Sequence, residues 1–323
     1  MPEAAPTLPS EHPVPHRPTV MLLGGSGFIG RHLAADYADR GWRVLIITRR
    51  PDDSRTELGE RFEYFRSLHH FDPSIWVDLV INLTGASVGD GRWTARRKQL
   101  LLDSRLEPTR ALADWLKTTS YKPQRVIQAS AVGYYGNGSQ TGWQKVLDEN
   151  GPPQPTVFVS ELCQQWEALA QQMQTDTGIP VTICRLGVVL GHGGGILPQL
   201  LKPVSMGVGR IGPGNQPLPW IHLDDVISAI RFVAERPTDP AWQIYNLVAP
   251  DLTTQLSFAE TAARLTHQRL RLTMPGLAMR LAMGEQADLV LDGQFIKPAR
   301  LLAEGFTFQY PDVEEALQNL LQK

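Results

Sequence analysis

The feature that most constrains the fold is a glycine-rich turn between a short apolar run and an amphipathic stretch. Residues 20–23 predict a buried strand, glycines follow at 24, 27 and 30, and apolar residues then recur with helical spacing. Gly24 permits a tight turn, Gly27 lets the backbone approach a phosphate, and Gly30 lets the helix pack closely on the strand. Because the first N–H groups of a helix attract anions, the stretch predicts a dinucleotide-binding unit and not a merely structural loop.

The end of the next apolar run, residues 42–48, bears on which dinucleotide binds. An acidic residue there would hold the ribose hydroxyls of NAD and repel the extra phosphate of NADP. This sequence instead has Thr48-Arg49-Arg50, and a guanidinium can bind a phosphate through two parallel hydrogen bonds. Arg49, and less clearly Arg50, therefore favour NADP over NAD. The alternative is a solvated basic turn in which an aspartate of the following turn contacts the ribose.

Apolar runs and helical patterns alternate through the first two thirds of the chain. Strands are predicted at 77–83, 125–129, 181–184 and 244–248, and helices at 93–116, 161–173 and 226–234, with Ser160 placed to cap the second. Strands that are apolar on both faces are typical of a parallel sheet covered by helices. The sequence thus predicts an α/β fold with a doubly wound parallel sheet.

Composition excludes several classes of function. The 323 residues, 42% hydrophobic, suit about two domains, and 31 basic against 33 acidic residues give a net charge of −2. Such a balance predicts no binding of nucleic acid. No apolar run is long enough for a membrane span, no histidine spacing suggests zinc, and Cys163 and Cys184 are too few for a disulfide framework.

The first eighteen residues contain six prolines and no apolar run, which predicts a disordered leader at 1–18. Signal peptides need an apolar centre and transit peptides are rich in arginine, so neither pattern fits. We therefore expect a cytoplasmic protein.

A series of motifs resembles the extended short-chain dehydrogenase/reductase superfamily. Within it, the chain is similar to the NAD(P)-dependent epimerase-like subgroup that has its own C-terminal domain. The matching blocks are Gly-Gly-Ser-Gly-Phe-Ile-Gly at 24–30, Arg92-Trp93, Ser104-Arg105, residues 130–136 ending in Tyr-Tyr-Gly, Trp166-Glu167, residues 185–195, residues 220–225, residues 291–294, Pro298, Gly305-Phe306 and Tyr310-Pro311. The resemblance covers residues 19–323.

This resemblance implies a Rossmann domain at 19–192 and 218–249, and a smaller C-terminal α/β domain at 193–217 and 250–323 that sets the substrate. It implies an NADP-binding oxidoreductase or epimerase that acts on an unidentified small molecule, and a homodimer. Some cyanobacterial and plastid members of the subgroup are described as SulA-like cell-division inhibitors. The alternative is therefore a dinucleotide-binding regulator that has lost its chemistry and acts through FtsZ.

The cofactor contacts that the resemblance implies form three groups: a phosphate loop, an adenosine-phosphate position, and positions along the rest of the dinucleotide. They are Gly24, Gly27, Phe28, Ile29 and Gly30; Thr48 and Arg49; and Leu83, Thr84, Gly85, Arg105 and Val189. For Arg105, a surface helix charge is the alternative.

The catalytic pair of the superfamily is missing. Its members use a tyrosine followed four residues later by a lysine, and no tyrosine in this chain has a lysine at that spacing. Registering the helix on Trp166-Glu167 puts Val159 and Cys163 in the places of this pair. Aligning on Tyr135-Gly136 puts Ala131 where the superfamily has a serine or threonine, with Ser130 one residue before it. The remaining candidates are Ser130, Tyr134 and Tyr135, for which ordinary packing is the alternative.

Two glycine-rich loops, 193–195 and 207–219, are candidates for a cover over the substrate site, and fixed surface loops are an equal alternative.

Overall fold

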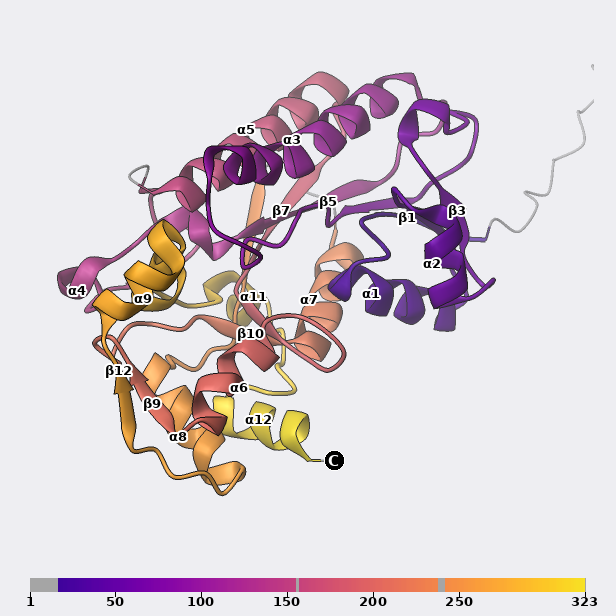
Figure 1. Cartoon of the computed structure of the whole chain (residues 1–323). Helices are drawn as coiled ribbons and strands as arrows, with labels where there is room; N and C mark the ends of the chain where they lie inside the picture. Colours follow the sequence, from indigo (N-terminus) through magenta and orange to yellow (C-terminus); the bar gives the residue numbers. More distant parts are fainter. Residues whose placement is uncertain (1–16, 155–156, 238–241, 323) are drawn as a thin grey trace, which may run out of the picture.

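The computed structural model describes residues 17–154, 157–237 and 242–322, and its centre is a seven-stranded sheet in which every pairing is parallel (Figure 1). The order is β11 (Gln243–Leu247), β7 (Val181–Leu186), β5 (Arg125–Ala131), β4 (Leu79–Asn82), β1 (Thr19–Leu23), β2 (Arg43–Ile47) and β3 (Glu63–Phe65). The predicted doubly wound parallel sheet is confirmed. The predicted leader lies outside the described residues except for Arg17 and Pro18.

The strand order reverses beside β1. The chain proceeds from β1 to β2 and β3 on one side and returns to β4 and β5 on the other. All five residues of β1 are buried, as expected for a central strand with helices on both faces. Open parallel sheets bind ligands outside the carboxyl ends of their strands at such a reversal, so the carboxyl end of β1 is the expected position of a ligand site.

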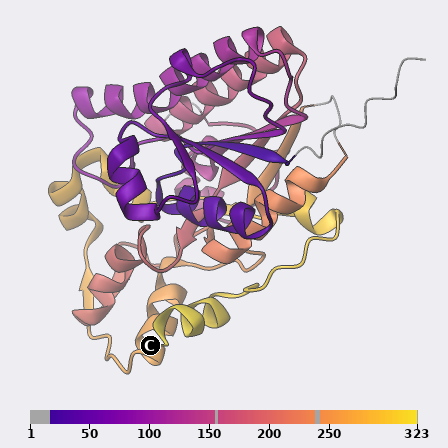
Figure 2. The ribbon, with the colours of Figure 1, turned by 90° about the vertical axis from the view of Figure 1, so that its right-hand side faces the viewer.

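Helices cover both faces of the sheet. On one face lie α3 (Ala95–Thr118) and α5 (Phe158–Thr177), which pack along each other, and on the other lie α1 (Phe28–Asp39) and α7 (Leu223–Glu235) (Figures 1 and 2). Alternate residues of β1 contribute to the two buried clusters, with Leu22 in one and Leu23 in the other. This alternation is the period of two that a strand imposes on its side chains.

The start of α5 differs from the sequence prediction. The helix begins at Phe158 with Val157 as its N-cap, three residues before the predicted start, so Ser160 is not the cap. Ser160 is instead fully buried in the first turn, and its hydroxyl donates to the carbonyl oxygen of Tyr134 at 2.7 Å. The reason is tertiary: Phe158 packs on the ring of Trp93, and this contact stabilises the additional residues at the start of the helix.

The C-terminal part of the chain forms a separate layer below the sheet (Figure 1). Helices α6, α8 and α12 pack there around one buried cluster, and three short parallel strand pairs join β8 to β10, β9 to β12, and β6 to β13. The bounds are β8 (Val188–Leu190), α6 (Leu197–Ser205), β9 (Val208–Ile211), β10 (Trp220–His222), α8 (Gln255–Leu265), β12 (Leu272–Met274), α9 (Gly276–Met283), η3 (Gly284–Ala287), α10 (Asp288–Leu291), β13 (Phe295–Ile296), α11 (Ala299–Ala303) and α12 (Val313–Leu321). The remaining short elements are α2 (Pro51–Leu58), η1 (Leu68–His70), η2 (Val132–Tyr135), α4 (Ser139–Gly142) and β6 (Val146–Leu147).

Within the described ranges, no helix is both long and apolar enough to cross a membrane. Over the same ranges, no three His, Cys, Asp or Glu side chains gather in a way that could hold a metal ion.

Candidate functional site

A cradle of backbone groups lies where β1 ends and α1 begins. Gly24 has a φ of +77°, a conformation that glycine adopts without strain, and its N–H donates to the carbonyl of Ile47 at 3.2 Å. A Cβ on Gly30 would lie 2.3 Å from the Gly24 carbonyl oxygen, so only glycine fits there. Gly27 is the N-cap of α1 and supplies no side-chain hydrogen bond. The first N–H groups of this twelve-residue helix therefore lack a side-chain cap, the arrangement that binds phosphate in other proteins.

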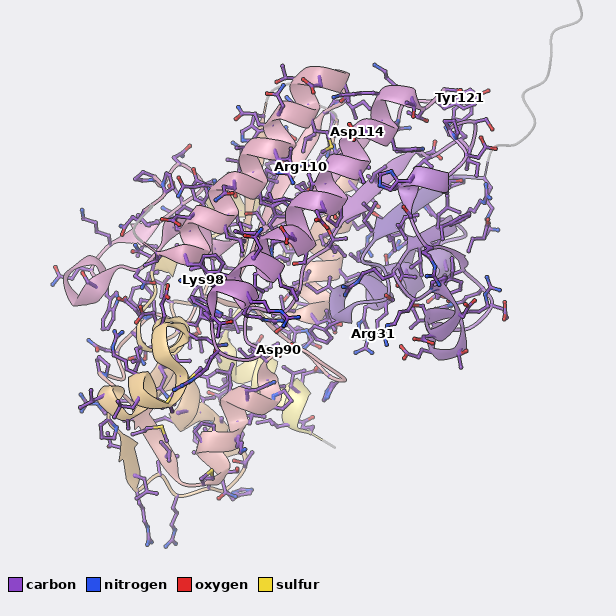
Figure 3. All side chains as sticks on the ribbon, turned by 45° about the horizontal axis from the view of Figure 1, so that its top comes forward. Arg31, Asp90, Lys98, Arg110, Asp114 and Tyr121 are labelled. Atoms are coloured by element: carbon purple, nitrogen blue, oxygen red, sulfur yellow. The ribbon has the colours of Figure 1, made fainter. Side chains whose placement is uncertain are left out.

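The loop 191–195 lies against the start of α1. The ring of Phe28 packs so closely on it that a Cβ at Gly191, Gly194 or Gly195 would come within 2.9 Å of the ring. Arg31, which Figure 3 shows on α1, donates to the carbonyl of Gly193. A Cβ on Gly195 would also lie 3.1 Å from the carbonyl oxygen of Val189, which places the end of β8 under this loop. Of the two loops predicted as covers, 193–195 therefore packs on the start of α1, and its role as a cover stays a prediction.

A cluster of hydroxyls and one unengaged guanidinium follow β2. The Thr48 hydroxyl lies 2.9 Å from that of Ser26 and 3.3 Å from that of Ser54. Arg49 is exposed and has no ion-pair partner among the described residues. Arg50 is engaged, because its Nη1 lies 3.4 Å from a carboxylate oxygen of Asp53. Of the two arginines, Arg49 is therefore the one available to a bound anion.

The turn after β4 runs beside the glycine cradle. The Asn82 side-chain oxygen accepts hydrogen bonds from the N–H of Thr84 at 3.1 Å and from its hydroxyl at 2.6 Å. A Cβ on Gly24 would lie 3.0 Å from the carbonyl oxygen of Leu83. The two turns therefore face each other at the carboxyl ends of β1 and β4.

Arg105 reaches this second turn from α3. Its Nη2 donates to the Ala86 carbonyl at 3.1 Å, its Nη1 to the Leu101 carbonyl at 3.0 Å, and its Cζ would lie 3.0 Å from a Cβ on Gly85. Burial lowers the pKa of Arg105, and its buried Nε has no hydrogen-bond partner among the described residues. The side chain is therefore no freely solvated helix charge, and its unpaired N–H suits an acceptor beside Gly85.

Val159 and Cys163 lie on the face of α5 that meets the turn after β5. A Cβ on Gly133 would lie 3.4 Å from the Cβ of Val159 and 3.8 Å from the Sγ of Cys163. Cys163 is buried, and burial raises the pKa of its thiol to about 11. Neither side chain can transfer a proton near neutral pH.

A buried ion pair stands behind this face. The Arg185 guanidinium donates to both Glu167 carboxylate oxygens, at 2.9 and 2.8 Å, and the Ser130 hydroxyl donates to the same carboxylate at 2.6 Å. The Arg185 side chain is 1% exposed and that of Glu167 8%. Burial alone would lower the pKa of Arg185, but the bond to Glu167 outweighs it and holds the pKa above its usual value. Ser130 is thus committed to a buried carboxylate.

Tyr135 completes the network. Arg185 donates to its hydroxyl oxygen at 2.9 Å, and that hydroxyl donates to the Asn246 side-chain oxygen at 2.8 Å. Burial raises the pKa of Tyr135 to about 12, although Arg185 acts in the opposite direction. Sequence reasoning missed the roles of Glu167, Arg185 and Asn246. The available signal was the presence of an arginine inside the apolar run 181–186.

Tyr134 is placed differently. It is half-buried, and its ring lies under the Arg185 guanidinium, whose Cζ is 3.4 Å from the ring centroid. It packs in one cluster with Trp93 and Phe158, and its hydroxyl has no hydrogen-bond partner among the described residues. Of the three candidates from the sequence, only Tyr134 combines a fixed ring with an uncommitted hydroxyl.

Comparison with known proteins agrees with this geometry. Residues 20–247 match the NAD dependent epimerase/dehydratase family, a stretch that contains the cradle and the whole of the buried network. The chain belongs to this family. Residues 274–320 match a domain described as being of unknown function, DUF1731. The motif-based resemblance is confirmed, including its C-terminal part.

Relatives within the family match almost the whole chain. An epimerase family protein of Staphylococcus saprophyticus is 35% identical over 304 residues, which cover 93% of this chain and 98% of that protein. The crystal structure of the human epimerase family protein SDR39U1 (isoform 2) with NADPH is 29% identical, with a TM-score of 0.81 over 94% of this chain and 98% of that one. A UDP-glucuronic acid 4-epimerase from Bacillus cereus, solved with NAD, is 17% identical with a TM-score of 0.73 over 93% and 96%, a likeness of fold alone.

Proposed function

We propose that this epimerase-family chain is an NADP-dependent oxidoreductase acting on a carbonyl substrate. The observation that carries the proposal is the start of α1, which has no side-chain cap. There Gly30 lies so close to the carbonyl oxygen of Gly24 that no Cβ fits at position 30. Arg49, beside the Thr48 hydroxyl and without an ion-pair partner among the described residues, supports NADP over NAD. The similar human protein was solved with NADPH.

The residues that would hold the cofactor fall along one edge of the sheet. The N–H groups of Phe28 and Ile29 would receive the pyrophosphate, Thr48 and Arg49 the adenosine phosphate, and the Leu83–Gly85 turn with Arg105 the middle of the dinucleotide. Val189, whose carbonyl oxygen lies under the loop 191–195, would lie beside the nicotinamide. When bound, the nicotinamide supplies or accepts hydride.

Tyr134 is the residue that we propose exchanges the proton with the substrate oxygen. Ser130 donates to Glu167 and Tyr135 to Asn246, so both protons are already engaged in the buried network. The Arg185 guanidinium fixes the ring of Tyr134 from one face. In a reduction, the hydroxyl of Tyr134 would give its proton to the oxygen while hydride reaches the carbonyl carbon.

The test is NADPH consumption with a panel of carbonyl compounds. We expect Tyr134→Phe to lower kcat at least about a hundredfold, the usual contribution of a general acid, while NADPH affinity stays unchanged. Tyr310→Phe, in the C-terminal part of the chain, is the control. Unchanged turnover in Tyr134→Phe would remove this residue from the mechanism.

A regulator that binds the dinucleotide without turnover is the second candidate, since Val159 and Cys163 stand where the family's tyrosine and lysine are expected. It predicts that NADPH binds, that no carbonyl compound of the panel is turned over, and that purified FtsZ is retained on the immobilised protein. The homodimer and the two-domain division stay predictions, which sedimentation equilibrium and limited proteolysis test.

A further inference from the structure

A small cavity of about 160 Å³ lies between the start of α5 and the segment η3–α10. Its wall includes Val159, the residue that stands at the family's tyrosine position. The lining residues are Trp93, Asn137, Val157, Phe158, Val159, Glu285, Asp288 and Leu289. The cavity therefore borders the position at which the family's tyrosine is expected, and the C-terminal segment forms its opposite wall.

The body of this cavity is apolar. Trp93 and Phe158 pack edge to face, with ring centroids 5.4 Å apart, and Tyr134 belongs to the same hydrophobic cluster. Leu289 approaches from the C-terminal side. Its volume is close to the ~150 Å³ of an apolar cavity that holds benzene, and below the roughly 300 Å³ at which pockets for drug-sized ligands begin. Size alone admits one ring or a branched group of similar bulk.

The rim of the cavity disfavours an anion. Among the described residues that line it, two are carboxylates and none is Lys or Arg. Glu285 is bound by Lys98 at 2.6 Å and Asp288 by Arg280 at 2.7 Å, so the nearest cations are already paired. Figure 3 shows Lys98 on α3, facing the C-terminal segment. A diphosphate entering here would meet two carboxylates and no free cation among the described lining residues.

The start of α5 gives the cavity hydrogen-bond donors. Its N-cap, Val157, makes no side-chain hydrogen bond, so the first-turn N–H groups at Phe158 and Val159 can donate to an acceptor. The carboxylates of Glu285 and Asp288 on the rim favour an uncharged acceptor over an anion. Asn137, which carries a side-chain amide, also lines the cavity. A carbonyl oxygen fits these donors without adding charge.

From these observations we infer that the substrate is a small uncharged carbonyl compound with an apolar body of about one ring, and not a nucleoside diphosphate sugar. The inference rests on the proposed function and names its substrate class. Most of the binding free energy comes from the apolar body.

Benzaldehyde, 4-formylbenzoate and UDP-glucose are the probes, titrated by calorimetry into the full chain with and without NADPH. We expect benzaldehyde to bind at least about tenfold more tightly than 4-formylbenzoate, which has the same body and one negative charge, and UDP-glucose not to bind this site. UDP-glucose binding tighter than benzaldehyde would overturn the inference.

A matched pair of variants places the ligand. Leu289→Phe fills the cavity from its half-exposed rim and should lower the affinity for benzaldehyde at least about fivefold. Leu281 is 72% exposed on α9, so Leu281→Phe should leave this affinity unchanged. Equal affinities in both variants would contradict the assignment. A protein that binds benzaldehyde but not NADPH would contradict the proposed function alone, and one that binds NADPH but not benzaldehyde would contradict this inference alone.

Discussion

Arg49 is the residue on which the preference for a phosphorylated cofactor rests. Arg49→Ala removes a guanidinium that is not engaged by any described residue, so we expect NADPH affinity to fall at least about tenfold, the worth of one hydrogen bond to a charged group, and NADH affinity to stay the same. Calorimetric titration of both cofactors measures this. Arg50→Ala is the control, because Arg50 already faces Asp53. An equal loss in both variants would show that only general positive charge matters.

Glu167 is the residue whose loss should cost most stability in the network. Glu167→Gln leaves the Arg185 charge buried without its carboxylate, and we expect the free energy of unfolding to fall by about 3 kcal/mol. Urea denaturation measures the change. Lys117→Met breaks the pair that Lys117 forms with Asp176 at 2.9 Å, which is largely exposed, and should leave the midpoint unchanged. Equal midpoints for the wild type and Glu167→Gln would contradict the importance of this pair.

Sequence reasoning at the level of residues succeeded where a motif has fixed spacing and failed where partners meet only in the fold. The glycine turn and the absence of the tyrosine–lysine pair are defined by short spacings along the chain, so both could be recognised in the sequence. The pairing of Glu167 with Arg185 joins α5 to β7, and Tyr135 meets Asn246 across 111 positions of sequence. No spacing rule predicts such contacts.

At the level of elements, α7 is held by an unusual cap. His222 is its N-cap, and its Nδ1 accepts the N–H of Asp224 at 3.1 Å. With Nδ1 as acceptor, Nε2 carries the proton and faces the Asn319 side-chain oxygen at 3.2 Å. The ring also packs on Tyr310, 3.9 Å between centroids. One neutral imidazole thus joins α7 to α12.

This cap predicts a pH dependence of stability. Burial lowers the pKa of His222 below 6.5 even though Asp224 acts in the opposite direction. The unfolded chain then binds the proton more tightly, so stability is full above pH 6.5 and is lost as the pH falls through the folded pKa. Protonation of Nδ1 would also remove the cap. We expect the urea midpoint of His222→Asn, which keeps a capping oxygen, to change less between about pH 7.5 and about pH 5.5 than that of the wild type.

The control for this series is Asn319→Asp, which keeps His222 titratable and adds a charge that favours its protonated form. Its midpoint should fall less steeply with decreasing pH than that of the wild type. Identical profiles for the wild type and His222→Asn would contradict the role of this histidine.

The positions of helices and strands were predictable because apolar periodicity sets them. Their first and last residues were less predictable. The strand predicted at 125–129 extends to Ala131, which pairs with Leu186 of β7, and α5 begins three residues early because Phe158 packs on Trp93. Both differences arise from tertiary contacts that local propensity does not contain.

At the scale of the whole molecule, the C-terminal segment packs against the loop that precedes α3. Arg92 donates to the carbonyl oxygens of Leu281, at 2.6 Å, and Ala282, at 3.0 Å, and the Gln286 amide donates to the Val88 carbonyl at 3.0 Å. These contacts span between 189 and 198 positions of sequence. The sequence indicated a C-terminal domain that sets the substrate, but not which residues would meet the first domain.

The central claim is that the glycine cradle and Arg49 together form a site for a phosphorylated dinucleotide. The most direct measurement is the ratio of the dissociation constants of NADH and NADPH for the wild-type chain, obtained by calorimetry at one salt concentration. The account predicts that NADPH binds at least about tenfold more tightly than NADH. Equal affinities, or no binding of either dinucleotide, would contradict it.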